Sequence, residues 1–139
     1  RLIGHGNFNL IPCPTGEYVY GVHYTPYSQD GPSDEKTGII YQYATDGSGY
    51  ATFFLGQYEY DYRGYQCLTI ANDGSYILLS QGEKIFKIDT STAWSSEPES
   101  TNQDKIQHTW ALPDSYGGDH AEQLRVNSIA ILPDGSRAY

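Results

Sequence analysis

The chain has 139 residues, the usual length of one domain, and it is rich in glycine (15) and tyrosine (14). Its 17 Asp and Glu residues outnumber its 8 Lys and Arg residues, which gives a formal net charge of −9. Scattered cations argue against nucleic acid and anionic membrane as partners, and apolar runs of only a few residues argue against membrane insertion. The acidity fits solubility, cation binding or a basic partner.

The first predicted element is a hairpin that turns at Gly16, with a short apolar strand before the turn and a second strand at about 17–24. The same pattern recurs at Gly74 and Gly135, where Asp-Gly pairs supply the positive φ of a narrow turn. The three turn glycines lie about 60 residues apart, which indicates an internal repeat.

Further strands follow each complete hairpin in the same order. After Gly16 the pattern predicts strands at 38–44 and 50–55, joined by an Asp-Gly-Ser-Gly turn. After Gly74 it predicts strands at 76–81, 84–89 and 106–112, the last beyond a long polar loop. β-Branched and aromatic residues fill these strands, and only residues 121–125 could form a helical turn. The sequence therefore predicts an all-β chain with four antiparallel strands in each period.

Four strands in a repeat of this length are typical of a β-propeller blade, and a two-sheet sandwich is the alternative. The predicted blades span about 8–55 and 66–112, and a third blade begins at about 126–139. Closed propellers have about 4–8 blades. We therefore expect the remaining blades to come from sequence outside this chain, from another chain or from self-association.

Two segments carry a family resemblance. Residues 133–139, Pro-Asp-Gly-Ser-Arg-Ala-Tyr, resemble the inner hairpin of lactonase-like and YVTN-type propellers. Residues 38–47 resemble bacterial repeats that run from a glycine and a β-branched pair to a strand ending in Asp-Gly. The resemblance implies propeller blades and transfers no catalytic residue.

In a propeller, the loops at 25–37, 56–66 and 113–125 emerge on the face that commonly carries ligand sites. The tyrosines at alternate positions of the second loop predict an aromatic row, because alternate residues of an extended segment share one face. Such a row can stack on sugars or rim a protein interface, and packing between blades is the alternative. The predicted binding residues are Tyr58, Tyr60, Tyr62 and Tyr65.

The third loop presents a candidate metal site. Asp119, His120 and Glu122 follow a Gly-Gly pair and can offer nitrogen and oxygen ligands together, with Asp61 from the second loop. This set suits a divalent cation such as calcium, or a general base. A loop histidine that is hydrogen-bonded to the backbone is the alternative.

Two other features carry expectations about packing. Residues 94–104 are rich in polar side chains and predict a surface insertion, whereas Trp110 is expected to pack between blades. Cys13 aligns with Ala71, and Cys67 lies four positions earlier on its own strand. That offset is roughly 13 Å, so we predict no disulfide between the two cysteines.

Two functions remain open. The first is an extracellular, secreted propeller that acts as a binding or structural module for protein or carbohydrate. The second is part of a propeller enzyme of lactonase, esterase or quinoprotein type, with a metal or cofactor at the channel mouth. The sequence contains no nucleophile elbow, Walker loop or dinucleotide fingerprint, which favours the binding module.

Overall fold

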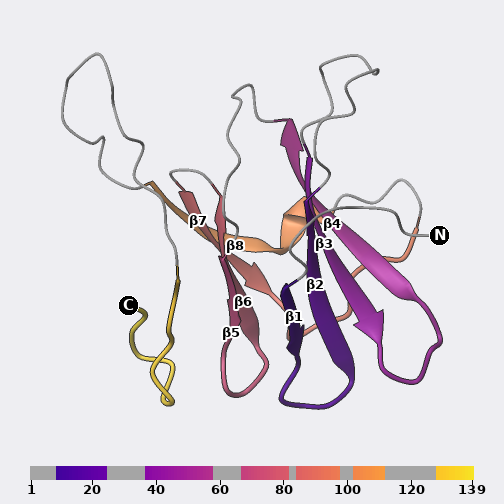
Figure 1. Ribbon diagram of the computed structural model, residues 1–139, viewed down its shortest axis with the longest axis horizontal. Coiled ribbons are helices and arrows are strands. Elements are labelled where there is room, and N and C mark those ends of the chain that lie inside the picture. The colour runs from indigo at the N-terminus through magenta and orange to yellow at the C-terminus, as the bar shows by residue number, and fades with distance from the viewer. Residues whose placement is uncertain (1–8, 25–36, 58–66, 82–83, 98–101, 112–127) are drawn as a thin grey trace. The chain divides into compact units, whose positions relative to one another are not determined.

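The computed structural model describes residues 9–24, 37–57, 67–81, 84–97, 102–111 and 128–139 (Figure 1). These residues form eight strands and one short 3-10 helix, Gln103–Lys105. The strands are β1 Asn9–Pro12, β2 Tyr18–Tyr24, β3 Thr37–Ala44, β4 Tyr50–Gln57, β5 Cys67–Ile70, β6 Tyr76–Gln81, β7 Lys84–Asp89 and β8 Ile106–Ala111. The prediction of an all-β chain is confirmed for the described residues, none of which lies in a helix long and apolar enough to cross a membrane.

The strands form two antiparallel sheets of four, each in sequence order. Sheet 1 has the order β1-β2-β3-β4 and sheet 2 the order β5-β6-β7-β8. Within each sheet every strand pairs with the next one in sequence, so both sheets are antiparallel meanders (Figure 1).

The chain divides into two compact units that are each discontinuous in sequence. Unit 1 comprises Arg1–Asp61 and Ala93–Gln103, and unit 2 comprises Tyr62–Thr92 and Asp104–Tyr139. Sheet 1 therefore shares its unit with a segment that follows β7, and we call residues 93–103 the strap.

The three turns that the sequence aligns are built with the same hydrogen bonds. Each turn glycine has a positive φ, 78° at Gly16, 73° at Gly74 and 69° at Gly135. Each donates its N–H to the carbonyl three residues earlier, at 2.9, 2.9 and 2.8 Å respectively. That earlier residue donates its own N–H across the hairpin: Cys13 to Tyr18, Ala71 to Tyr76 and Leu132 to Arg137.

A threonine after the third strand of each sheet is hydrogen-bonded to the first hairpin of the same sheet. The Thr45 hydroxyl donates to the Gly16 carbonyl at 2.7 Å, and the Thr90 hydroxyl donates to the Gly74 carbonyl at 2.6 Å. Their backbone N–H groups also donate to the residue after each glycine, both at 3.0 Å. Thr45 and Thr90 therefore mark equivalent positions in the two sheets.

One face of sheet 1 forms the core of unit 1. The register places Tyr20 beside Gln42 and Ile40 beside Phe53, and all four side chains are buried. Trp94 of the strap packs onto this face, with its ring centroid 5.4 Å from that of Tyr20 and 5.7 Å from that of Phe53. We call this the inner face of sheet 1.

The buried Gln42 amide is bonded at both ends. Its Nε2 donates to the Tyr20 hydroxyl at 2.9 Å, and its Oε1 accepts the Trp94 N–H at 3.2 Å. A buried polar group costs free energy unless it is hydrogen-bonded, so this arrangement makes a glutamine compatible with the core.

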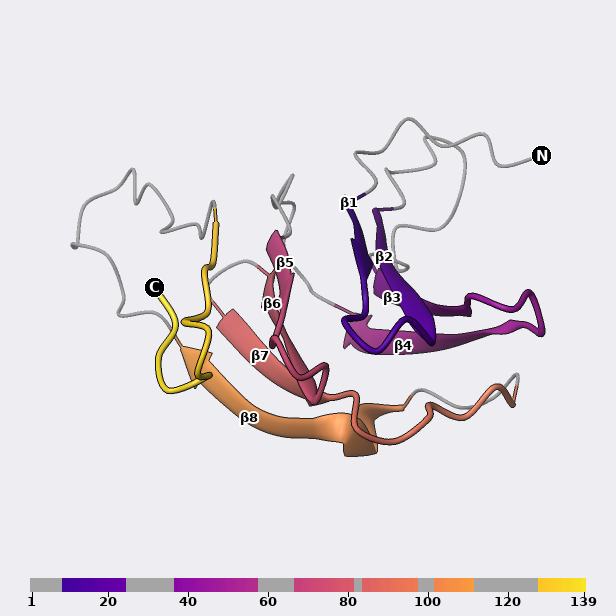
Figure 2. The same cartoon turned by 90° about the horizontal axis from the view of Figure 1, so that it is seen from below.

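Asn102 holds the other end of the strap. Its Nδ2 donates to the Thr52 carbonyl at 2.7 Å and to the Ser95 carbonyl at 3.0 Å, while its Oδ1 accepts the Ser95 N–H at 2.8 Å. Its φ of 53° lies in the left-handed region, which asparagine tolerates better than most residues. Figure 2 shows the described part of the strap running along sheet 1.

The interpretation of residues 94–104 as a surface insertion is wrong at its two anchors. Trp94 is 4% exposed and Asn102 is 2% exposed. Polar side chains between these anchors, such as Ser96 and Glu97, are exposed and dominate the composition. The segment therefore resembles a solvated loop in sequence although it completes a core.

Unit 2 contains sheet 2 and the third hairpin. Ile77, Leu79 and Ile88 are fully buried. The hairpin at 128–139 is bonded to the second one: Asn72 Nδ2 donates to the Pro133 carbonyl at 3.1 Å, and the Tyr76 hydroxyl donates to the Gly135 carbonyl at 3.4 Å. Trp110 on β8 is 43% exposed among the described residues, and its packing against a further blade stays a prediction.

Candidate binding surface

The binding and metal residues expected from sequence lie in loops outside the described residues. These are Tyr58, Tyr60, Tyr62 and Tyr65 of the aromatic row, and Asp61, Asp119, His120 and Glu122 of the metal set. Within the described residues, no group of three or more His, Cys, Asp or Glu side chains could hold a metal ion. The candidate surface that the structure does describe lies on sheet 1.

Sheet 1 presents a tyrosine cluster on the face opposite its core. Strand alternation puts Tyr41 and Tyr43 on the other side of β3 from Ile40 and Gln42. Tyr43 pairs with Tyr50 of β4 in the sheet register. We call the surface formed by Leu10, Tyr41, Tyr43 and Tyr50 the tyrosine face.

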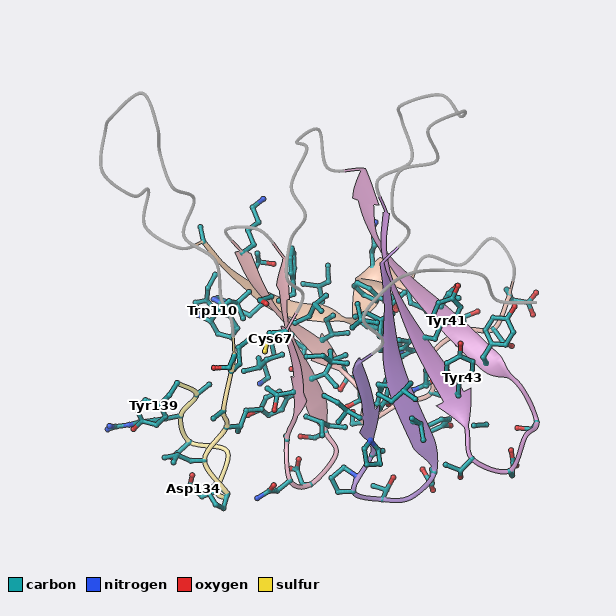
Figure 3. All side chains as sticks on the ribbon, in the orientation of Figure 1. Tyr41, Tyr43, Cys67, Trp110, Asp134 and Tyr139 are labelled. Carbon is teal, nitrogen blue, oxygen red and sulfur yellow. The ribbon has the colours of Figure 1, made fainter. Side chains whose placement is uncertain are left out.

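The three rings contact one another. Tyr41 and Tyr43 are stacked, with centroids 5.5 Å apart and an interplanar angle of 14°. The Tyr50 ring is tilted against both, at 5.8 Å from Tyr41 and 5.9 Å from Tyr43. Figure 3 labels Tyr41 and Tyr43 side by side on sheet 1. Such contacts fix the side chains and lower the entropy that a ligand would have to remove.

A glycine on β2 makes room beside the cluster. A Cβ atom at Gly21 would lie 2.9 Å from Leu10 Cδ2 and 3.8 Å from Tyr43 Cε2. Leu10 of β1 pairs with Gly21 in the register and leans over it. The absence of a side chain at Gly21 thus joins Leu10 to the tyrosines in one continuous apolar surface.

This surface is open to solvent. Leu10 is 61% exposed, Tyr50 is 59% exposed and Tyr43 is 37% exposed. Scattered single apolar residues are normal on a protein surface, whereas contiguous apolar patches mark interaction sites. Tyrosine in particular is enriched at interfaces, because its ring supplies contact area and its hydroxyl remains hydrated.

Sheet 2 carries different side chains at the equivalent positions. Counting back from Thr45 and Thr90, Tyr41 corresponds to Phe86 and Tyr43 corresponds to Ile88. Both Phe86 and Ile88 are buried. The two sheets therefore share their turns and strand order but differ in the chemistry of this face, and only sheet 1 presents tyrosines on it.

Burial raises the pKa of Tyr41 and Tyr43 above the ordinary tyrosine value. A second cause is repulsion between phenolates: Tyr50 raises the pKa of Tyr41, and Tyr41 and Tyr50 raise that of Tyr43. The hydroxyls of Tyr41 and Tyr43 therefore stay protonated at neutral pH.

The sequence contained a signal for this surface. The alternation in β3, Ile40-Tyr41-Gln42-Tyr43, separates its side chains into two sets. The alternation does not say which set is exposed, and a glutamine favours solvent exposure of the set that contains it. The burial of Gln42 depends on Tyr20 and on Trp94, which is 52 residues away in sequence.

Both cysteines are free thiols and belong to different units. Cys13 is buried, and its Sγ lies 3.2 Å from the Thr15 hydroxyl. Burial raises the pKa of the half-buried Cys67, and a backbone hydrogen bond from Ile129 opposes that effect. A raised pKa makes Cys67 a poor nucleophile at neutral pH.

No protein-family model, no curated protein and no solved structure matches the chain.

Proposed function

We propose that this chain is a non-enzymatic binding module of β-propeller type that acts outside the cell and recognises protein or carbohydrate. Its binding surface is the tyrosine face of sheet 1. The observation that carries the proposal is the mutual contact of three tyrosine rings on a solvent-open sheet face. Rigid aromatic platforms of this kind provide much of the binding energy in protein interfaces and stack on sugar rings.

Repetition of the hairpin supports the propeller part of the proposal. Three turns share one hydrogen-bond pattern, and each sheet is a four-stranded meander. A propeller is built from such meanders, with each blade packed on its neighbours, so the proposed binding requires an assembly in which no further blade covers the tyrosine face. High tyrosine and glycine content with few lysines supports an extracellular location.

The test compares the 139-residue chain with a Tyr43→Thr/Tyr50→Thr variant. Threonine keeps the β-propensity of both positions but removes the rings. Two probe sets are used: short random peptides displayed on phage, and the hexasaccharides of cellulose, xylan and chitin. We expect at least one probe to bind the wild-type chain and to bind the variant at least about tenfold more weakly.

Tyr139→Thr is the matched control, because Tyr139 is also an exposed tyrosine but lies in the third hairpin (Figure 3). This change should leave binding unaltered. Circular dichroism would confirm that all variants keep their β-structure. The proposal is overturned if no probe binds, or if every bound probe binds the Tyr43→Thr/Tyr50→Thr variant as tightly as the wild type.

A further inference from the structure

The charged side chains that the structure describes in unit 1 are all of one sign. Within the described residues of unit 1, the charged side chains Glu17, Asp46 and Glu97 are all acidic, and none is Lys or Arg. All three are exposed. This part of the chain therefore contributes a negative potential without compensating cations.

Two of these carboxylates lie at the end of the sheet where the tyrosines lie. Tyr43 and Tyr50 form the last strand pair before the β3–β4 turn, and Asp46 is in that turn. Glu17 is in the neighbouring β1–β2 turn, since its carbonyl accepts the Thr45 N–H at 3.0 Å. Hydrogen bonds from Ser48 lower the pKa of Asp46, so this carboxylate is ionised at neutral pH.

The face of an aromatic ring attracts cations, because its quadrupole is negative above and below the ring plane. The chain already contains this interaction: Lys87 Nζ lies 4.3 Å from the centroid of the Tyr76 ring in unit 2. On the tyrosine face, the rings of Tyr43 and Tyr50 are exposed and tilted at 45° to each other, so a ligand can reach them. Exposed carboxylates at the edge of the sheet would strengthen the attraction over about one Debye length, roughly 8 Å.

We propose that the tyrosine face binds the cationic side chains of a basic protein segment, with arginine preferred over lysine. This inference rests on the proposed function and names the partner's chemistry. Arginine is preferred because its planar guanidinium can stack on a ring while its N–H groups remain available to carboxylates. A neutral sugar could stack on the same rings but would gain no attraction between opposite charges from Glu17 and Asp46.

The experiment measures binding of fluorescein-labelled peptides that alternate glycine with arginine, lysine, glutamine or glutamate. We expect the arginine peptide to bind the 139-residue chain more tightly than the lysine peptide. The glutamine and glutamate peptides should bind at least about tenfold more weakly. Raising the salt concentration should weaken binding of the arginine peptide, since part of the attraction is between exposed charges.

Three variants separate the rings from the carboxylates. Tyr43→Thr/Tyr50→Thr should weaken binding of the arginine peptide by about tenfold, since each exposed cation–π contact contributes a few-fold. Tyr43→Phe/Tyr50→Phe should keep affinity within about twofold, because the ring face and not the hydroxyl attracts the cation. Glu17→Gln/Asp46→Asn should weaken binding a few-fold and reduce its salt dependence. Tyr139→Thr should change nothing.

The results distinguish this inference from the function on which it rests. Tyrosine-dependent binding of neutral peptides or hexasaccharides, without preference for arginine or lysine, would overturn the inference and keep the binding module. Equal binding of the arginine peptide to the wild type and the Thr variant would also overturn it, because only general charge attraction would remain. If no peptide and no sugar binds in a tyrosine-dependent way, both proposals fail.

Discussion

Glycine at a hairpin turn is a requirement of backbone geometry in this chain. Gly16, Gly74 and Gly135 all have φ near +70° to +80°, a region where an L-residue with a side chain meets steric resistance. Gly16 isolates this effect, because a Cβ atom added there would have no heavy atom within 4 Å. Any cost of substitution at Gly16 therefore comes from the backbone.

We predict that Gly16→Ala lowers the free energy of unfolding by about 1 kcal/mol. Gly16→Asn should cost less, since asparagine visits the left-handed region more readily. Urea unfolding followed by circular dichroism would measure both variants. Equal stability of the alanine variant and the wild type would show that the φ angle at this turn does not require glycine.

The burial of Gln42 could not be predicted from the strand sequence. A glutamine in a strand predicts a solvated position, and here its two polar ends are bonded to Tyr20 and to the backbone of Trp94. The partner on the strap comes from 52 residues away. No local pattern specifies that contact, so the inner face of sheet 1 could not be distinguished from the tyrosine face.

At the scale of elements, the strands were predictable and the strap was not. The expected strands at 76–81 and 84–89 coincide with β6 and β7, because β-branched and aromatic residues and turn glycines mark them locally. The strap has no periodicity, and its anchors are one tryptophan and one asparagine among exposed polar residues. The loops that carried the predicted sites lie outside the described residues, so those sites stay predictions.

The packing of the strap on sheet 1 predicts a large loss of stability when the Trp94 side chain is removed. Trp94→Ala would leave a cavity against Tyr20 and Phe53, and we expect it to lower the free energy of unfolding by about 3–5 kcal/mol. Urea unfolding followed by circular dichroism would measure the loss.

Trp110→Ala provides the control, because the chain has two tryptophans and Trp110 is exposed. Its removal should change stability by no more than about 0.5 kcal/mol. Equal effects of the two substitutions would contradict the placement of Trp94 in the core of unit 1.

At the scale of the whole molecule, the tyrosine cluster links stability to alkaline pH. The pKa of Tyr41 and of Tyr43 is raised in the folded chain, first by burial and then by the neighbouring phenols. The folded state therefore holds these protons more tightly than the unfolded state does. The stabilisation is present below the unfolded pKa of about 10 and is lost as pH rises through the folded pKa values.

We expect the urea midpoint of unfolding to fall as pH increases above about 10. Tyr43→Phe/Tyr50→Phe should flatten this dependence, because it removes one of the two shifted groups and a phenol that shifts both. Urea midpoints of the wild type and the Phe variant, measured at several pH values from neutral to alkaline, would show whether the slope changes. An unchanged slope in the Phe variant would assign the pH dependence to other groups.

The strap also has a consequence for how the chain acquires its structure during synthesis. A ribosome releases residues in order, so all four strands of sheet 1 emerge before Trp94 and Asn102 are available. Until then the inner face of sheet 1 lacks the ring that packs on Tyr20 and Phe53. A nascent chain that ends between β4 and β7 therefore has a complete sheet 1 whose inner face lacks its contact with Trp94. For the same reason, a cut between β4 and β5 would separate sheet 1 from part of its own core.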